Sequence, residues 1–146
     1  AWDAYGNELI GELTIPIKKS KPSLRDRIKT GSFLDLSTQY SDNQFDLITC
    51  IDVIEHLVDP ILGAREMYRI LKPGGVIVYQ TVDVTPENRA LKEKWGGLKA
   101  NEHLVCFNTE NYRTFAEKAG FINIEFAPEP FEVCDGNFVA ICHKPE

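Results

Sequence analysis

The sequence predicts an α/β fold built on one mostly parallel sheet, with an antiparallel edge strand at its C-terminal end. Short apolar runs alternate with stretches whose apolar residues recur every three or four positions, as strands alternate with helices. Turn residues at Pro128, Pro130 and Asp135-Gly136 separate the last two apolar runs. The chain has 146 residues, the length of one domain, and it shows no internal repeat.

The first elements can be placed in order along the chain. Residues 4–9 and 28–33 are candidate strands, and residues 45–54 are the clearest strand because both of its faces are apolar. Asp59 is suited to cap the next helix, and Pro60 fits its first position. An apolar stripe follows at spacings of three and four, formed by Ile61, Ala64, Met67, Tyr68 and Leu71.

A second buried strand is predicted over residues 76–81. Pro73-Gly74-Gly75 is expected to end the preceding helix. Residues 82–108 contain no clear element before the apolar run 103–107. A long irregular segment of this kind is typical of a lid or a substrate loop.

The C-terminal third is predicted to contain one more helix and two strands. Thr109 can cap the helix, and Gly120 lies just past its expected end. Residues 121–126 and 137–143 are strand candidates joined by turn residues, which favours an antiparallel pair at a sheet edge.

Composition excludes several classes of function. The net charge is −6, which argues against a nucleic-acid-binding domain and against a polybasic membrane anchor. The basic residues between Lys18 and Lys29 could attract an anionic acceptor or nucleic acid, but such a cluster is more often a solvated face, and this is the interpretation adopted. No apolar run approaches the roughly 18 residues of a membrane span. The four cysteines form no Cys-x-x-Cys pair, and their placement favours the reducing cytoplasm over an oxidising compartment.

Three segments together carry a resemblance to a known family. They are "FDLITCIDVIEHLVDP", "EMYRILKPGGVIVYQT" and "NEHLVCFNTENYRTFAEKAGF". In combination they resemble class I S-adenosylmethionine-dependent methyltransferases, in the small-molecule branch that includes the ubiquinone-type O-methyltransferases. The resemblance is firm over residues 45–121 and looser elsewhere. It implies a seven-stranded Rossmann-like sheet in the order 3-2-1-4-5-7-6, with residues 45–52 as strand 4 and 76–81 as strand 5.

The sequence departs from the family at its front. The ten glycines contain no Gly-x-Gly, so the family's glycine-rich cofactor loop and the strand before it have no counterpart. We interpret residues 1–146 as a single methyltransferase domain that is incomplete at its N-terminal end. We therefore expect this chain by itself to bind S-adenosylmethionine poorly.

The resemblance implies S-adenosylmethionine as the cofactor and suggests which residues hold it. Glu8, at the end of the first candidate strand, would accept the ribose hydroxyl protons. Ser32 and Phe33 would contact the adenine, where the family more often has an acidic residue. Further cofactor contacts are expected at the end of strand 45–52 and just beyond it, from Cys50, Ile51, Asp52 and His56.

Two histidines have competing interpretations. In some ubiquinone-type relatives the trio Asp52, Glu55 and His56 resembles a divalent-metal site. We favour the simpler role, in which Glu55 and His56 cap and orient the loop that follows them, and no metal ligand is assigned. The family places a histidine beside the methyl acceptor, which makes His103 the candidate catalytic base; its alternative is a structural histidine bonded to a loop carbonyl.

These observations predict an S-adenosylmethionine-dependent methyltransferase that acts on an oxygen, nitrogen or carbon atom of a small molecule. A non-catalytic methyltransferase-like scaffold or partner subunit is the alternative. A nucleotide-dependent dehydrogenase on a similar sheet is disfavoured because Gly-x-Gly-x-x-Gly is absent. We expect a cytoplasmic protein that binds neither nucleic acid nor membrane, and a homodimer is left open.

Overall fold

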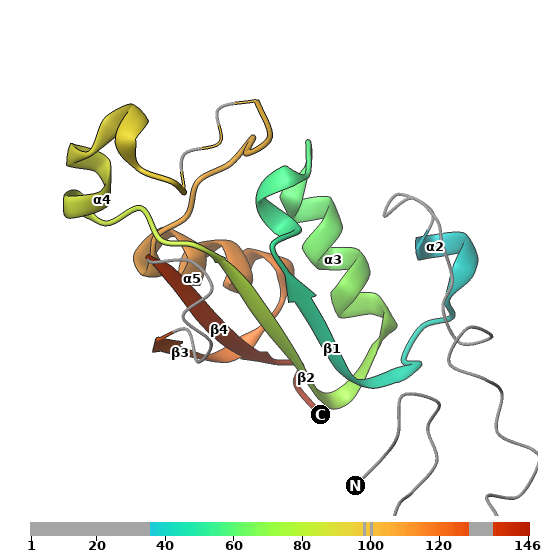
Figure 1. Cartoon of the computed structure of the whole chain (residues 1–146). Coiled ribbons are helices and arrows are strands. Elements are labelled where there is room, and N and C mark those ends of the chain that lie inside the picture. The colour runs from blue at the N-terminus through green and yellow to red at the C-terminus, as the bar shows by residue number, and fades with distance from the viewer. Residues whose placement is uncertain (1–35, 98, 100, 129–135) are drawn as a thin grey trace, which may run out of the picture. The chain divides into compact units, whose positions relative to one another are not determined.

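The computed structural model describes residues 36–97, 99, 101–128 and 136–146 (Figure 1). The candidate strands 4–9 and 28–33 lie outside these residues. The described part is a four-stranded sheet with the order β1-β2-β4-β3, accompanied by helices. That order matches the 4-5-7-6 half of the sheet that the resemblance implies. The strands are β1 (Phe45–Ile51), β2 (Leu71–Val82), β3 (Ile122–Pro128) and β4 (Asn137–His143).

The strand directions agree with most of the predicted pattern. Strand β1 pairs with β2 in parallel, with Leu47 opposite Val76 and Ile51 opposite Gln80. The C-terminal strand β4 is antiparallel to both β2 and β3, as expected for the last strand. It lies between these two strands, however, and β3 takes the edge position. Strands β1, β2 and β3 therefore all point in one direction.

Helix α3 (Pro60–Ile70) connects β1 to β2 and begins as predicted. The Asp59 side chain accepts a hydrogen bond from the Leu62 N–H at 2.9 Å, and Pro60 occupies the first turn. The predicted end of this helix is wrong. Helix α3 ends at Ile70, and Pro73-Gly74-Gly75 lie inside β2, which begins at Leu71. Residues 73–75 have no partner in the β1 register, which passes from Leu71 to Val76, and this bulge accommodates them.

Helix α5 (Thr109–Ala119) ends where predicted and has a different N-cap. Asn108, not Thr109, is the N-cap: its side chain accepts from the Asn111 N–H, and the Asn111 side chain accepts from the Asn108 N–H. Both hydrogen bonds measure 2.8 Å, so they form a reciprocal capping box. Gly120 ends the helix as predicted, with a φ of 108°.

The segment 82–108 is more structured than expected. It contains α4 (Pro86–Ala90) and a short 3-10 turn, η3 (Lys92–Lys94). The apolar run 103–107 is not a strand; its only ladder contact in the described ranges is an isolated bridge between Phe107 and Asp83. Two further short elements are α2 (Leu36–Gln39) and the 3-10 turn η2 (Ile54–His56).

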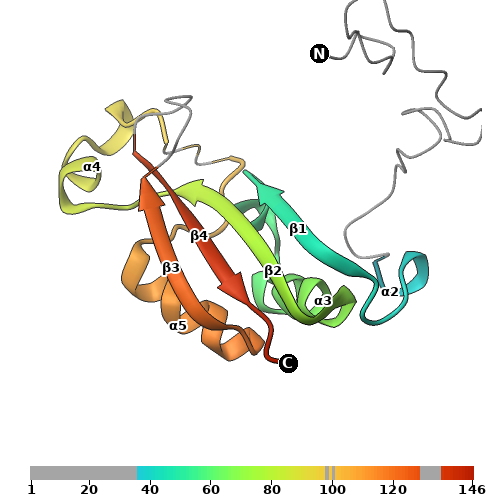
Figure 2. The ribbon, with the colours of Figure 1, turned by 90° about the horizontal axis from the view of Figure 1, so that it is seen from below.

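The hydrophobic core lies between the sheet and the helices α3 and α5, which pack against each other and cover the same face (Figure 2). Tyr79 of β2 and Tyr112 of α5 are fully buried at its centre, with ring centroids 5.6 Å apart. This arrangement fixes the ends of β1 and β2 relative to the loops that follow them. Among the described residues, no helix is long and apolar enough to cross a membrane.

Candidate active site

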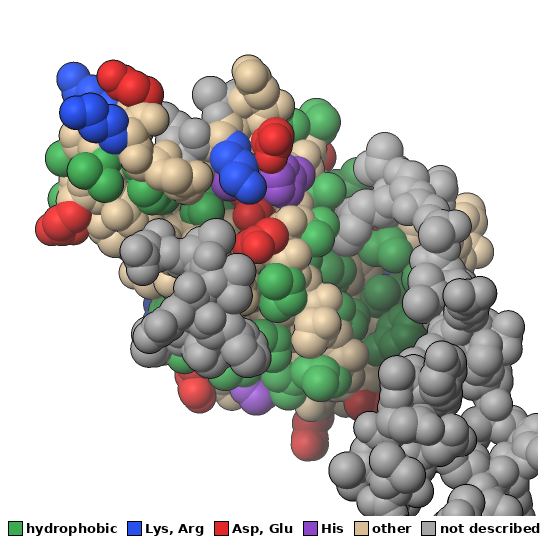
Figure 3. Space-filling view, in the orientation of Figure 1, with side chains coloured by type: hydrophobic (Ala, Val, Ile, Leu, Met, Phe, Trp, Pro, Cys, Tyr) green, Lys and Arg blue, Asp and Glu red, His purple; other side chains and the backbone are tan. Residues whose placement is uncertain are grey.

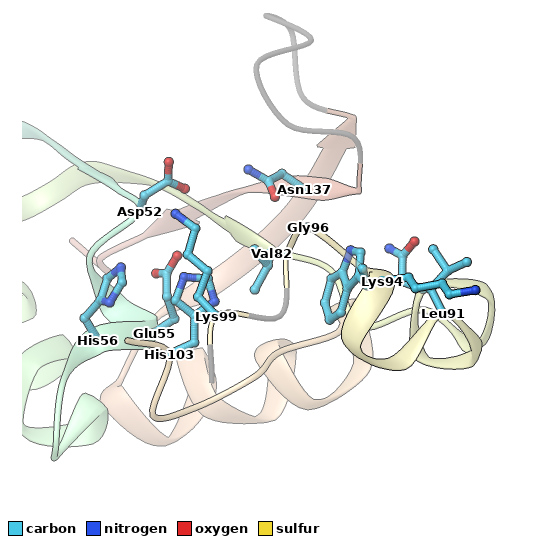
Figure 4. A pocket seen from close by; sticks show the side chains of 13 residues that line it. Asp52, Glu55, His56, Val82, Leu91, Lys94, Gly96, Lys99, His103 and Asn137 are labelled. Atoms are coloured by element: carbon cyan, nitrogen blue, oxygen red, sulfur yellow. The ribbon is translucent and has the colours of Figure 1, made fainter. Parts of the chain in front are cut away.

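A pocket of about 420 Å³ opens where β1 and β2 end and β4 begins (Figure 4). In open α/β sheets, ligands bind at the carboxyl ends of the parallel strands. One wall follows β1 and η2, and the opposite wall is formed by α4, η3 and the residues after them. Its lining residues are Asp52, Glu55, His56, Val82, Asn88, Leu91, Lys94, Trp95, Gly96, Gly97, Lys99, His103 and Asn137.

Asp52 stands at the mouth of this pocket because the chain turns sharply after β1. Its φ is 49°, an uncommon value for a residue with a side chain. Its N–H donates to the Gln80 carbonyl of β2 at 3.1 Å, so the turn is attached to the neighbouring strand. A residue held in this way at a strand end is a frequent feature of functional sites.

The turn η2 and the segment 102–105 are joined by three hydrogen bonds. The Glu55 carbonyl accepts from the N–H groups of Leu104, at 2.8 Å, and Val105, at 3.1 Å. The His56 Nδ1 lies 2.9 Å from the Glu102 carbonyl oxygen. Glu55 and His56 therefore hold the segment 102–105, whereas the sequence suggested that they orient the loop that directly follows them.

His103 is brought against His56 by these bonds. Their ring centroids are 4.8 Å apart at an interplanar angle of 75°, an edge-to-face contact. The His103 Nδ1 is buried and has no hydrogen-bond partner within the described part of the chain. The candidate base therefore lies in the pocket wall, with an unsatisfied ring nitrogen.

Glu55 is the most unusual side chain of the site. Its relative exposure is 0%, and neither carboxylate oxygen has a hydrogen-bond partner among the residues that the structure describes. Burial of the Cys50 thiol, followed by the nearby Glu55 carboxylate, raises the pKa of Cys50 to about 12. A buried carboxylate without partners is costly unless something in the site compensates its charge.

Trp95 forms the other side of the pocket. It is 7% exposed, and its indole N–H has no acceptor in the described ranges. Gly97 permits this packing because a Cβ there would lie 2.6 Å from the Trp95 ring. The aromatic ring thus gives the pocket an apolar wall that carries one free donor.

The surface around the pocket carries both signs of charge. Figure 3 shows basic, acidic and histidine side chains side by side among the described residues of this part of the surface. Lys99 and Glu102 form a long ion pair of 3.9 Å between exposed side chains.

The structure brings some of the predicted site residues together. Asp52, His56 and His103 line one pocket. Cys50 is buried and Ile51 is 46% exposed at the end of β1, and neither lines the pocket. The predicted residues Glu8, Ser32 and Phe33 lie outside the described residues.

The lining residues that were not anticipated from the sequence include Asn88, Lys99 and Asn137. Asn88 and Lys99 come from the segment read as irregular, where no periodicity marks a position. Asn137 lines the site because β4 is antiparallel and begins where β1 and β2 end. The antiparallel strand was predicted from the sequence. Its first residue could therefore have been recognised as a candidate lining residue.

Comparison with known proteins identifies the type of domain. A family model described as "Methyltransferase domain" matches residues 9–125. A ubiquinone biosynthesis O-methyltransferase from Pseudomonas putida (strain W619) is 43% identical over 44 residues. That alignment spans 30% of this chain and only 19% of the relative's length.

Solved structures show the same fold. A SAM-dependent methyltransferase from Thermotoga maritima, a possible histamine N-methyltransferase, is 25% identical, with a TM-score of 0.56 over 73% of this chain and 59% of that one. Phosphoethanolamine N-methyltransferase 2 from Haemonchus contortus, in complex with S-adenosyl-L-methionine, has a TM-score of 0.51 at 17% identity. It matches 74% of this chain and 35% of its own.

Proposed function

This chain belongs to the methyltransferase domain family, and from that membership we propose that it transfers a methyl group from S-adenosylmethionine to a small-molecule acceptor. The observation that carries the proposal is the pocket at the carboxyl ends of β1 and β2, where His103 lies in the wall. The pocket volume of about 420 Å³ suits a small molecule. The partial similarity to a ubiquinone biosynthesis O-methyltransferase supports a small-molecule acceptor with a hydroxyl group.

The chemistry requires little from the protein beyond positioning. An acceptor oxygen attacks the methyl carbon as the carbon–sulfur bond breaks, and the electron pair of that bond stays on sulfur in S-adenosylhomocysteine. The oxygen loses its proton to His103. The protein aligns the two reactants and excludes water, and the cofactor supplies the leaving group. Nitrogen and carbon acceptors remain compatible with the same geometry.

The cofactor contacts form part of the proposal. Asp52 and His56 line the pocket next to β1, while Cys50 and Ile51 belong to the strand end on which the cofactor would lie. Glu8, at the first candidate strand end, is proposed as the ribose anchor, and Ser32 and Phe33 as adenine contacts. The buried Trp95 ring offers the acceptor an apolar wall.

His103→Ala tests the acceptor-side role. Loss of a general base lowers turnover by about a hundredfold, and cofactor affinity should stay within about twofold of the wild-type value. Initial rates with tritiated S-adenosylmethionine and a panel of small phenols measure the first quantity. Calorimetric titration of the cofactor measures the second, with the protein expressed from its complete gene.

His143→Ala is the matched control, because His143 lies at the opposite end of β4 from the pocket. It should leave turnover unchanged. Turnover that survives in the His103 variant while its melting temperature falls would make His103 structural. A protein that binds the cofactor and methylates no acceptor would favour the scaffold alternative.

A further inference from the structure

The two walls of the pocket differ in chemistry. The wall that follows β1 and η2 carries Asp52 and Glu55, and His103 lies beside them (Figure 4). The opposite wall contributes apolar side chains, those of Leu91 and Trp95, which stand at the two ends of η3. An acceptor bound between these walls therefore meets ionisable groups on one side and an aromatic ring on the other.

Trp95 is fixed in its wall by the local chain. Its backbone N–H donates to the Lys92 carbonyl at 3.0 Å, where η3 ends. A Cβ at Gly97 would lie 2.6 Å from the ring carbons Cε2 and Cζ2 and 2.9 Å from Nε1. Glycine at this position lets the backbone pass close to the nitrogen-bearing edge of the ring. The position of the indole is therefore set by the residues on either side of it.

The indole N–H of Trp95 is a buried donor. It has no hydrogen-bond acceptor among the described residues, and Trp95 is only 7% exposed. An indole nitrogen can only donate, and a buried donor that stays unpaired costs free energy. Because Trp95 lines the pocket, a bound molecule can supply the acceptor atom. On this side, the pocket therefore suits a ligand that carries an oxygen next to an apolar ring.

We propose that Trp95 selects the acceptor by packing against a planar aromatic ring and donating its N–H to an oxygen substituent of that ring. The inference rests on the proposed methyl transfer, which places the reacting hydroxyl at His103. His103 and Trp95 approach the bound molecule from opposite walls, so its two oxygens lie across the ring from each other and not on adjacent carbons. The substrate class is a phenol with a carbonyl, carboxylate or ether oxygen in the para position.

A site of this kind discriminates against phenols that lack the second oxygen. Such a ligand would cover the indole N–H and leave it unpaired, whereas a matching ligand would satisfy it. Sites that hydrogen-bond a substrate group reject an analogue without that group more strongly than an apolar pocket distinguishes two ligands of different size. For one neutral hydrogen bond, we expect a contribution to the discrimination of about tenfold in affinity. A Trp95 that only stabilises the fold would make no such contribution.

The test compares two ligands of nearly the same shape, 4-hydroxyacetophenone and 4-isopropylphenol, in which a methyl group replaces the carbonyl oxygen. Calorimetry in the presence of S-adenosylhomocysteine gives both dissociation constants for the protein expressed from its complete gene. The preference for the ketone should be about tenfold lower in Trp95→Phe than in the wild type, because the ring remains and the N–H is lost. Both proteins meet the same two ligands, so differences in ligand hydrophobicity cancel. An unchanged preference, or no saturable binding of either ligand to the wild type, would overturn the proposal.

Two further variants separate the hydrogen bond from the shape of the wall. Leu91→Ala is the matched control: it alters the same wall without removing the donor and should weaken both ligands alike. Gly97→Ala keeps the indole and forces it to shift, so the preference should fall in this variant too. Where Trp95→Phe fails to fold, Gly97→Ala decides, and an unchanged preference there contradicts the proposal.

The binding measurement needs no methyl transfer, so the two proposals fail in different ways. A preference that depends on Trp95, found in a protein that methylates neither phenol, would support the selection by Trp95 and contradict the methyl transfer. Methylation of both phenols with a preference that Trp95→Phe leaves unchanged would contradict the selection alone.

Discussion

Cys50 and Glu55 show how the site's chemistry depends on single buried side chains. Cys50 lies near the end of β1 and Glu55 lies in η2. Both stand among apolar residues, and both side chains are buried in the interior. The motif Glu-His identified this position in the sequence. Its burial did not follow from the motif, because carboxylates are rarely buried and no local pattern marks one that is. Glu55 is removed from water by tertiary packing, in which η2 contacts α3 and β2.

The cysteines should differ sharply in reactivity. Burial raises the pKa of Cys50 and of Cys142 to about 12, so their thiolate fraction at pH 8 is on the order of one in ten thousand. Cys106 is exposed. Brief iodoacetamide treatment of the native protein at pH 8, followed by peptide mass spectrometry, should modify Cys106 and leave Cys50 and Cys142 intact. Unfolding in urea serves as the control and should expose all of them. Equal labelling of Cys50 and Cys106 in the native protein would contradict the packing of β1.

Helix boundaries show what propensity can and cannot predict at the scale of an element. The cap of α3 was predictable because Asp59 precedes a proline at the first helical position. The cap of α5 was misplaced by one residue, because Asn108 and Thr109 are both good caps and only the reciprocal bonds to Asn111 distinguish them. The end of α3 was misplaced for another reason. Pro73 and the glycines after it can lie within a strand where a bulge interrupts the ladder, and this depends on the partner strand.

The capping box of α5 provides a direct stability test. Asn108→Ala removes the acceptor for the Asn111 N–H and should lower the free energy of unfolding by about 1 kcal/mol. Thr109→Ala is the matched control and should change it by less than about 0.5 kcal/mol. Urea denaturation followed by circular dichroism measures both values. A larger loss in the Thr109 variant would mean that the helix begins one residue later than the structure has it.

At the scale of the whole molecule, the sheet order was accessible from the sequence and the composition of the pocket was not. The family resemblance that the three quoted segments carry implied the neighbours of β1 and β2, and the observed order β1-β2-β4-β3 matches it. The pocket also depends on α4, η3 and Trp95, which come from a segment without periodicity. The segment that contains them is held by contacts between residues far apart in the sequence, such as the bridge between Asp83 and Phe107.

The central claim is that S-adenosylmethionine binds at the carboxyl ends of β1 and β2, beside the acceptor pocket. Ultraviolet crosslinking of labelled S-adenosylmethionine to the protein expressed from its complete gene, followed by peptide mapping, tests it most directly. The account predicts label in the peptide that contains residues 50–56, and loss of that label when excess S-adenosylhomocysteine is added. Label confined to peptides from the opposite end of the strands, around Ile122 and His143, would contradict the claim. Labelling that S-adenosylhomocysteine does not displace would contradict it as well.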